Sequence, residues 1–148
     1  MWRKITEADL LTRLSANELD TIRSIAEGES RGDPVAEAVA NVTAKVRGYI
    51  AGNRSNVIGP AGTIPETLID VAVALLVVDL YGRSAGLLVD LNDVRKAAAQ
   101  AAERTLRDVA SGSFRVELPG ASHDFAGASA AEMASPSKPL RRDDLKGL

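Results

Sequence analysis

Apolar residues recur at intervals of three and four positions through much of the chain, which is the spacing of one helix face. The clearest stretch follows Asp33-Pro34, and its apolar stripe consists of Val35, Val39, Val42, Val46, Tyr49 and Ile50. Asp33 is a favourable N-cap, and Pro34 suits the first helical position. Gly52 and Asn53 end the pattern. The sequence therefore predicts a long amphipathic helix over residues 34–52.

Two short helices are predicted ahead of this one. Thr6 is placed as an N-cap with acidic residues after it, so a helix is expected to start at Glu7. The segment Ser15-Ala16-Asn17-Glu18 has the form of a capping box, in which the Ser and Glu side chains each bond the other's backbone amide. The second helix is expected to run to about Glu27, and Gly28 is expected in the left-handed conformation that often follows a helix.

A central helix is predicted between Pro65 and Tyr81. Residues 68–80 are apolar on nearly every side, and their Val content would also suit a buried strand, but the length favours a helix surrounded by the others. Gly82 is a plausible cap, and Asp79 and Arg83 have the i,i+4 spacing of an ion pair.

The last long helix is expected to open at Leu91-Asn92-Asp93 and to stop at Ser111-Gly112-Ser113. Its predicted apolar stripe is narrow and built of small residues that let a neighbouring helix approach closely: Val94, Ala98, Ala101, Ala102, Thr105 and Val109. The segment Phe114–Leu118 then alternates apolar and polar residues, which predicts one short strand. Such a strand needs a partner for its backbone groups.

From Gly120 onward the composition changes to Ala, Ser, Gly and Pro and then to a charged run, with almost no periodic apolar signal. Residues 120–148 are therefore predicted to be a flexible tail. The predicted fold class is all-α: a small bundle of about five helices over residues 1–119, with one short C-terminal strand and a flexible C-terminal tail. We expect Phe114–Leu118 and the tail to become ordered only in an assembly.

Composition removes much catalytic and metal chemistry. The 148 residues include no Cys and one His, which excludes disulfide frameworks, thiol nucleophiles and zinc sites of the Cys/His type. Lys and Arg number 18 and Asp and Glu 20, so the net charge of −2 creates no global attraction to DNA or an anionic membrane. No apolar run reaches the ~20 residues that a bilayer requires, and Met1–Asp9 does not resemble a secretory signal. We expect no enzyme, no metal or cofactor, and synthesis in the cytoplasm.

Two local motifs look like functional sites but have simpler explanations. The segment Ser122-His123-Asp124 contains the three residue types of a catalytic triad, yet neighbours in sequence point apart, and real triads gather separated segments. The segment Gly59-Pro60-Ala61-Gly62 lacks the Lys and the preceding strand of a phosphate-binding loop. Neither segment is predicted to be a site.

Two sets of residues are candidates for contacts with other molecules. On the last helix, Arg95, Lys96, Arg104 and Arg107 could contact nucleic-acid phosphates, with Lys96, Arg104 and Arg107 the candidates for a channel or DNA-facing surface. Acidic residues are interleaved with them, and no aromatic residue is placed to stack on bases. Trp2 is expected to be either folded onto the core or buried by a partner. The candidates for a subunit or partner interface are Trp2, Ala98, Ala101, Phe114, Val116 and Leu118.

The order and spacing of several segments resemble a known group of phage proteins. They are Ile5-Thr6-Glu7-Ala8-Asp9-Leu10 with Arg13-Leu14, Val46-Arg47-Gly48-Tyr49-Ile50-Ala51-Gly52, the Pro-containing loop, Asp79-Leu80-Tyr81-Gly82-Arg83, and Leu106-Arg107-Asp108-Val109-Ala110-Ser111-Gly112. In these features residues 5–119 resemble the head–tail connector (adaptor or head-completion) proteins of tailed bacteriophages and prophages, in particular the Mu-like prophage branch. The turn Glu27–Asp33 departs from the more regular acidic Asp-Gly turn of that branch, and the central helix lacks basic residues near its middle.

The resemblance implies an all-α subunit of a ring, commonly twelvefold, beneath the portal of a DNA-filled head. Such a subunit extends the DNA channel and offers a surface to the tail or neck, without an enzymatic step. The implied partners are further copies of the chain, the portal protein, a tail or neck completion protein, and DNA passing without sequence specificity. The implied location is the head–tail interface of the virion.

Two alternatives stay open. Within the phage class, the chain could be a tail-completion or neck protein one layer further down. From another class, it could be a small α-helical nucleic-acid-binding protein, such as a regulator or packaging factor, that uses the basic residues of the last helix.

Overall fold

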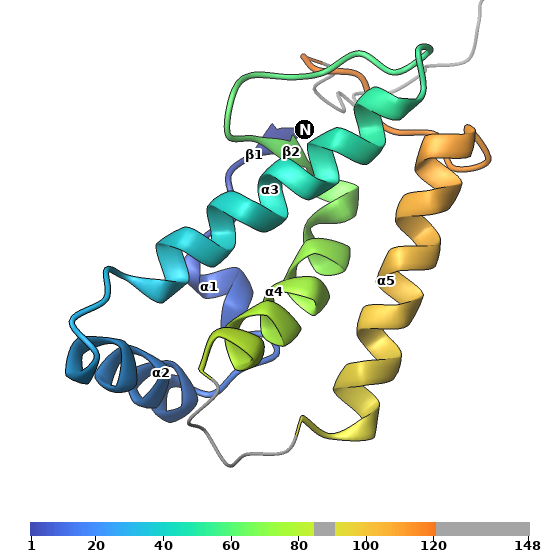
Figure 1. Cartoon of the computed structure of the whole chain (residues 1–148). Coiled ribbons are helices and arrows are strands. Elements are labelled where there is room, and N and C mark those ends of the chain that lie inside the picture. Colours follow the sequence, from blue (N-terminus) through green and yellow to red (C-terminus); the bar gives the residue numbers. More distant parts are fainter. Residues whose placement is uncertain (85–90, 121–148) are drawn as a thin grey trace, which may run out of the picture.

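A computed structural model of the protein describes residues 1–84 and 91–120 (Figure 1). The elements in chain order are β1 (Trp2–Arg3), α1 (Glu7–Leu10), α2 (Ala16–Gly28), α3 (Pro34–Gly52), β2 (Ile64–Pro65), the 3-10 turn η1 (Glu66–Leu68), α4 (Ile69–Arg83) and α5 (Asp93–Ser111). The prediction of a mainly helical bundle of five helices is confirmed. The predicted tail, after Gly120, lies outside the described residues.

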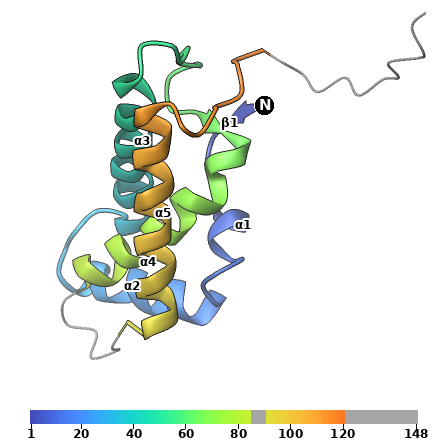
Figure 2. The ribbon, with the colours of Figure 1, turned by 90° about the vertical axis from the view of Figure 1, so that its right-hand side faces the viewer.

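The three long helices α3, α4 and α5 pack against one another, with α1 and α2 at one end of the bundle (Figures 1 and 2). Helix α4 contacts α1, α3 and α5, and this central position explains its apolar sequence. Its buried residues are Ile69, Ala72, Val73, Ala74, Leu75, Leu76, Val77 and Leu80. Because neighbours cover α4 on several sides, it needs no polar face. The prediction of a central helix is confirmed.

The predicted helix starts are confirmed by their hydrogen bonds. The Asp33 side chain accepts from the Val35 amide at 3.0 Å. The Ser15 amide donates to the Glu18 carboxylate at 2.8 Å, and the Glu18 amide donates to the Ser15 hydroxyl at 3.2 Å. Each bond satisfies an amide that has no partner inside its helix, so local sequence is enough to place these starts.

Two predicted glycine caps are wrong. Gly28 lies inside α2, and Ser30 adopts the left-handed conformation instead, with φ of 54°. The turn is closed by the Arg31 amide, which donates to the Ala26 carbonyl, so the reversal falls two residues later than expected. Gly82 lies inside α4, which continues to Arg83, where the Arg83 side chain pairs with Asp79 at 2.7 Å as predicted.

The predicted strand at Phe114–Leu118 is also wrong, because this segment is extended but joins no sheet. The short antiparallel sheet pairs Trp2 with Pro65 and Arg3 with Ile64. Pro65 therefore belongs to β2 rather than to the central helix, which is consistent with its extended ψ of 138°. The C-terminal segment is instead held to the N-terminus by the Trp2 indole, which donates to the Glu117 carbonyl, and by the Glu117 carboxylate, which pairs with the Met1 ammonium group.

The buried face of α5 is rotated relative to the predicted stripe. Ala102, Leu106 and Val109 are buried, whereas Val94 is 77% exposed and Ala101 is exposed. At 100° per residue, Val94 lies roughly 90° around the helix from the direction shared by the buried residues. The predicted stripe omitted Leu106, which is the largest side chain on the buried face of this helix.

Candidate interaction surfaces

Trp2 is packed within the chain at the end of the bundle where the N-terminus, the loop after α3 and the C-terminal segment meet. Its side chain is buried, and its indole N–H donates to the Glu117 carbonyl at 2.9 Å. Gly59 lies so close to the ring that a Cβ on this residue would be 2.5 Å from two ring carbons. Of the two environments expected for Trp2, folding onto the core is the one observed.

Arg47 holds the loop between α3 and β2 in place. Its Nη1 donates to the carbonyls of Pro60 at 2.8 Å and Thr63 at 2.7 Å, and its Nη2 donates to the Gly59 carbonyl at 3.1 Å. The guanidinium also lies 6.0 Å from the centre of the Trp2 ring. Arg47 thus joins α3, the loop and the N-terminal strand. The sequence showed Arg47 only as part of a family-like motif, because no local pattern identifies three distant carbonyls.

Glu117 attaches the C-terminal segment to the start of the central helix. Its carboxylate accepts from the Glu66 amide at 2.7 Å and pairs with the Met1 ammonium group. Burial raises the pKa of Glu117, but the ammonium group and the backbone amides outweigh it, so the net pKa is lowered. Because η1 begins at Glu66, the negative charge lies at a helical N-terminus, where it is favoured.

The expectation that Phe114–Leu118 becomes ordered only in an assembly is therefore wrong for this segment. Phe114 and Val116 are half-buried against the core of the single chain. The Phe114 amide donates to the Asp108 carbonyl at 3.0 Å. Leu118 differs from them, because it is 57% exposed.

Four large apolar side chains are exposed around buried Trp2, and we call Met1, Val57, Ile58 and Leu118 the end patch. They are four of the six exposed large hydrophobic residues in the described part of the chain. Ile58 precedes Gly59, which touches the Trp2 ring, and Leu118 follows Glu117, which accepts the Trp2 hydrogen bond. Three separate segments therefore expose apolar side chains at the end of the bundle that holds Trp2, which sequence periodicity could not indicate.

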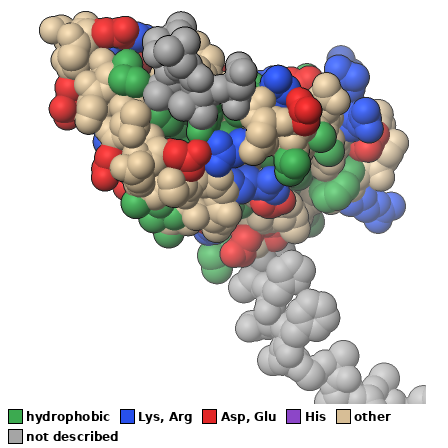
Figure 3. All heavy atoms as spheres, turned by 90° about the horizontal axis from the view of Figure 1, so that it is seen from below, with side chains coloured by type: hydrophobic (Ala, Val, Ile, Leu, Met, Phe, Trp, Pro, Cys, Tyr) green, Lys and Arg blue, Asp and Glu red, His purple; other side chains and the backbone are tan. Residues whose placement is uncertain are grey.

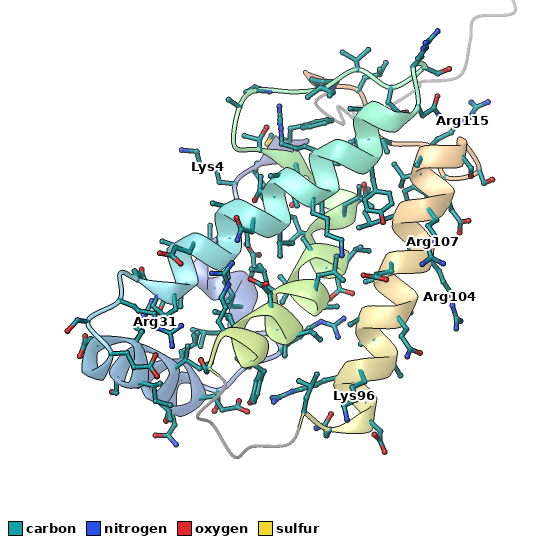
Figure 4. The ribbon with its side chains drawn as sticks, viewed as in Figure 1. Lys4, Arg31, Lys96, Arg104, Arg107 and Arg115 are labelled. Carbon is teal, nitrogen blue, oxygen red and sulfur yellow. The ribbon has the colours of Figure 1, made fainter. Side chains whose placement is uncertain are left out.

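Two of the predicted basic residues of α5, Arg104 and Arg107, lie on its outer side (Figure 4), whereas Lys96 lines a groove that α5 forms with α3 and α4. Arg107 lies 4.0 Å from Glu103, and Lys96 lies 4.0 Å from Asp93, while Arg104 has no hydrogen bond or ion pair with another described residue. Glu103 also accepts a 2.8 Å hydrogen bond from Lys45 on α3, and this bond lowers the pKa of Glu103. Ala101 is exposed on α5, and Ala98 is half-buried.

Arg95, in contrast, faces inward and is already engaged. Its Nη1 donates to Glu18 at 2.9 Å and to the Tyr81 hydroxyl at 2.7 Å, and its Nη2 donates to the Arg13 carbonyl at 3.1 Å. The Arg95 hydrogen bond is the main cause that lowers the pKa of Glu18 to about 2. Burial and the bond to Glu18 raise the pKa of Tyr81. This cluster fixes α5 relative to α2 and α4, and it removes Arg95 from the candidate phosphate contacts.

A groove of about 400 Å³ lies between α3, α4 and α5, and a larger one of about 600 Å³ runs along the outer side of α3. The α3 groove is lined mainly by small side chains, including Ala36, Ala40 and Ala44, with Lys4 at its rim. Within residues 1–84 and 91–120, no group of three or more metal-ligating side chains gathers, and no helix is long and apolar enough to cross a membrane.

Comparison with known proteins places the chain in a phage family. The family model described as Bacteriophage Mu, Gp36 matches residues 5–135, which include every described helix. No curated protein and no solved structure matches the chain. The match confirms the resemblance to a Mu-like phage protein that the order of sequence segments had indicated. Because the matched region covers most of its length, this chain belongs to the Gp36 family of bacteriophage Mu.

Proposed function

We propose that this Mu-like phage protein is a head–tail connector subunit. It is a structural virion protein that forms a ring under the portal, joins the DNA-filled head to the tail and extends the DNA channel. Its partners are other copies of the chain, the portal protein, a tail or neck completion protein, and DNA that passes without sequence specificity. Family membership and the helical fold are consistent with this role.

The end patch is the observation that carries the proposal. Exposed large apolar side chains at one end of a protein commonly mark a site of protein interaction. The patch is held by Arg47, Trp2 and Glu117, so its shape exists before any partner arrives, and little ordering cost is added on binding. The chain also continues from Leu118 through Gly120 into its C-terminal residues, so those residues start beside the patch. We assign this end to contact with the portal.

The test is to mix the purified protein with its cognate portal, or with packaged tailless heads. We expect co-sedimentation and an added ring at the portal vertex by electron microscopy. The double variant Ile58→Ser/Leu118→Ser should lose attachment and keep its helical circular dichroism. Leu11→Ser is the matched control, because Leu11 is 46% exposed but lies at the end of α1. Absence of binding by the wild type would overturn the proposal, and full binding by the double variant would remove the end patch from it.

A truncation tests the role assigned to the predicted tail. Removing residues 120–148 should leave a folded helical core, measured by circular dichroism, and should impair attachment to heads. Normal head completion by the truncated protein would contradict this role. Attachment to isolated tails but not to portals would indicate the tail-completion alternative.

The second candidate function is non-specific nucleic-acid binding through α5. It is favoured by Arg104, which has no ion pair with another described residue, and by the exposed position of Arg107. The wild type should then bind DNA with an affinity that falls steeply with salt, since each phosphate contact contributes a slope of about −0.9 in log K against log salt. The double variant Arg104→Gln/Arg107→Gln should abolish this affinity. No salt-dependent DNA affinity in the wild type would remove this candidate.

A further inference from the structure

Helix α2 carries two exposed carboxylates on its outer face, and one of them, Asp20, interacts electrostatically with Arg23 on the same helix. Asp20 and Glu27 are exposed, and neither side chain makes a hydrogen bond or ion pair with another described residue. They are seven residues apart, so they lie on one face about 10 Å apart along the helix axis. Ser24 is exposed between them, and the opposite face of α2 is buried through Leu19 and Ile22. We call Asp20, Ser24 and Glu27 the acidic face.

Helix α5 carries three exposed cations, and two of them form only 4.0 Å ion pairs within their own helix. The side chains of Lys96 and Arg107 are 56% and 70% exposed, with their nearest carboxylates at 4.0 Å. Arg104 has no ion pair within the described residues, and Glu103 already binds Lys45 on α3. Lys96 and Arg107 are about 16 Å apart along the axis, which spans the separation of the two carboxylates on α2. We call Lys96, Gln100, Arg104 and Arg107 the basic face.

The helices that carry the two faces, α2 and α5, lie on different sides of the bundle. In Figure 1, α2 is at the lower left and α5 at the right, and in Figure 2, α5 faces the viewer with α2 behind it. Figure 3, which keeps left and right as in Figure 1, shows mostly acidic side chains at the left and both basic and acidic side chains in the middle and at the right. Arg95 and Glu18 join the N-terminal ends of these helices, but their outer faces point away from their buried sides and are free to meet a second copy.

We propose that the basic face of one copy binds the acidic face of a second copy. Opposite charges on two different faces favour a head-to-tail contact, since a two-fold contact through either face would bring like charges together. Head-to-tail contacts close into a ring when the rotation between copies allows it, so this contact supplies the subunit interface of the proposed connector ring and rests on that function for its role.

A second copy suits the basic face better than nucleic acid does. Glu103, Asp93 and Asp108 lie beside the basic residues, and a continuous phosphate backbone would meet these carboxylates. The acidic face instead offers two discrete carboxylates within the span of the three cations. Exposed Ala97 and Ala101 on α5 are small, so they allow close approach of another helix.

The natural absence of Cys allows a direct crosslinking test. Ser24→Cys and Gln100→Cys place one thiol on each face, and both positions are exposed. A short bismaleimide should crosslink a mixture of the two variants, while either variant alone should give only background. Asn41→Cys mixed with Gln100→Cys sets that background, because Asn41 is exposed on α3 outside both faces. A mixed yield equal to this background would overturn the proposal.

Charge reversal shows whether the contact depends on these ion pairs. Asp20→Lys/Glu27→Lys in the Ser24→Cys chain, or Arg104→Glu/Arg107→Glu in the Gln100→Cys chain, should each lower the crosslink yield about tenfold. Combining the two reversed chains should restore the yield, and raising the salt should weaken the wild-type contact. A crosslink yield that charge reversal leaves unchanged, or that is not restored when the two reversed chains are mixed, would refute the proposed ion pairs.

The outcomes separate this inference from the connector function. Restored crosslinking together with no attachment to portals would leave the self-contact in place and remove the connector role. A normal ring at the portal built by either reversed chain alone would remove the self-contact and leave the connector role. Loss of salt-dependent DNA binding in the Arg104→Glu/Arg107→Glu chain, with unchanged crosslinking, would assign the basic face to nucleic acid.

Discussion

Replacing Arg47 by Ala should free the loop between α3 and β2 while leaving the helices assembled. In the native chain Arg47 binds the carbonyls of Gly59, Pro60 and Thr63 and lies over the Trp2 ring. The Ala variant leaves these carbonyls to water or to no partner. The loop then loses the contacts that press Gly59 against Trp2 and position the end patch.

The expected loss of stability follows from these contacts. A hydrogen bond from a charged donor contributes about 1.5–3 kcal/mol, and partial exposure lowers this to about 1 kcal/mol each, or about 3 kcal/mol for the three. For a chain of this size such a loss lowers Tm by roughly 10 °C. Arg47→Lys should lose about half as much, since an ammonium group lacks the planar fork that reaches three carbonyls at once.

The assay uses the single tryptophan of the chain, Trp2, which lies against the loop. Urea unfolding followed by Trp2 fluorescence should show the loss in both Arg47 variants, and far-UV circular dichroism should show the native helix content before unfolding. Arg104→Ala is the control, with a change of at most about 0.5 kcal/mol, because Arg104 has no partner among the described residues. This account of the loop would be refuted if the free energy of unfolding of Arg47→Ala fell by less than about 1 kcal/mol, or if it fell equally in the Ala and Lys variants.

The remaining predictions concern glycine positions and pH. Gly59→Ala should destabilise the protein by about 2 kcal/mol, because the new Cβ would lie 2.5 Å from the Trp2 ring. Gly48→Ala in α3 should stabilise it by about 0.5–1 kcal/mol, because no described atom lies within 4 Å of the new Cβ. The urea midpoints of the two variants should therefore move in opposite directions. The pKa of Glu18 falls from 4.5 to about 2 on folding, chiefly through the Arg95 hydrogen bond, so its charge stabilises the fold above pH 4.5 and this contribution is lost as pH falls toward 2. The stability difference between wild type and Glu18→Gln should therefore shrink over that range, and a constant difference in urea titrations at several pH values would contradict it.

The interaction surfaces could be predicted only in part. Five of the predicted contact residues are exposed, as such residues must be: Lys96, Ala101, Arg104, Arg107 and Leu118. Trp2, in contrast, is enclosed by its own chain. The acidic face of α2 was not predicted at all, because its carboxylates appear in the sequence as an ordinary solvated helix face. The role that we propose for these carboxylates depends on the cations of α5, which are distant from them in the sequence.

The sequence by itself determined where the helices begin and which helix lies at the centre. Capping by Thr6, Ser15, Asp33 and Asn92 uses hydrogen bonds within three residues, and the uninterrupted apolar run of α4 requires neighbours on several sides. Only the tertiary structure decided what the chain ends contact and which way α5 faces. Trp2 and Glu117 are 115 positions apart, and no local pattern encodes their bond or the three carbonyls that Arg47 reaches. The bundle brings such distant groups together because burying the large side chains of α4 and α5 sets the positions of the helices, and the polar contacts at the chain ends depend on those positions.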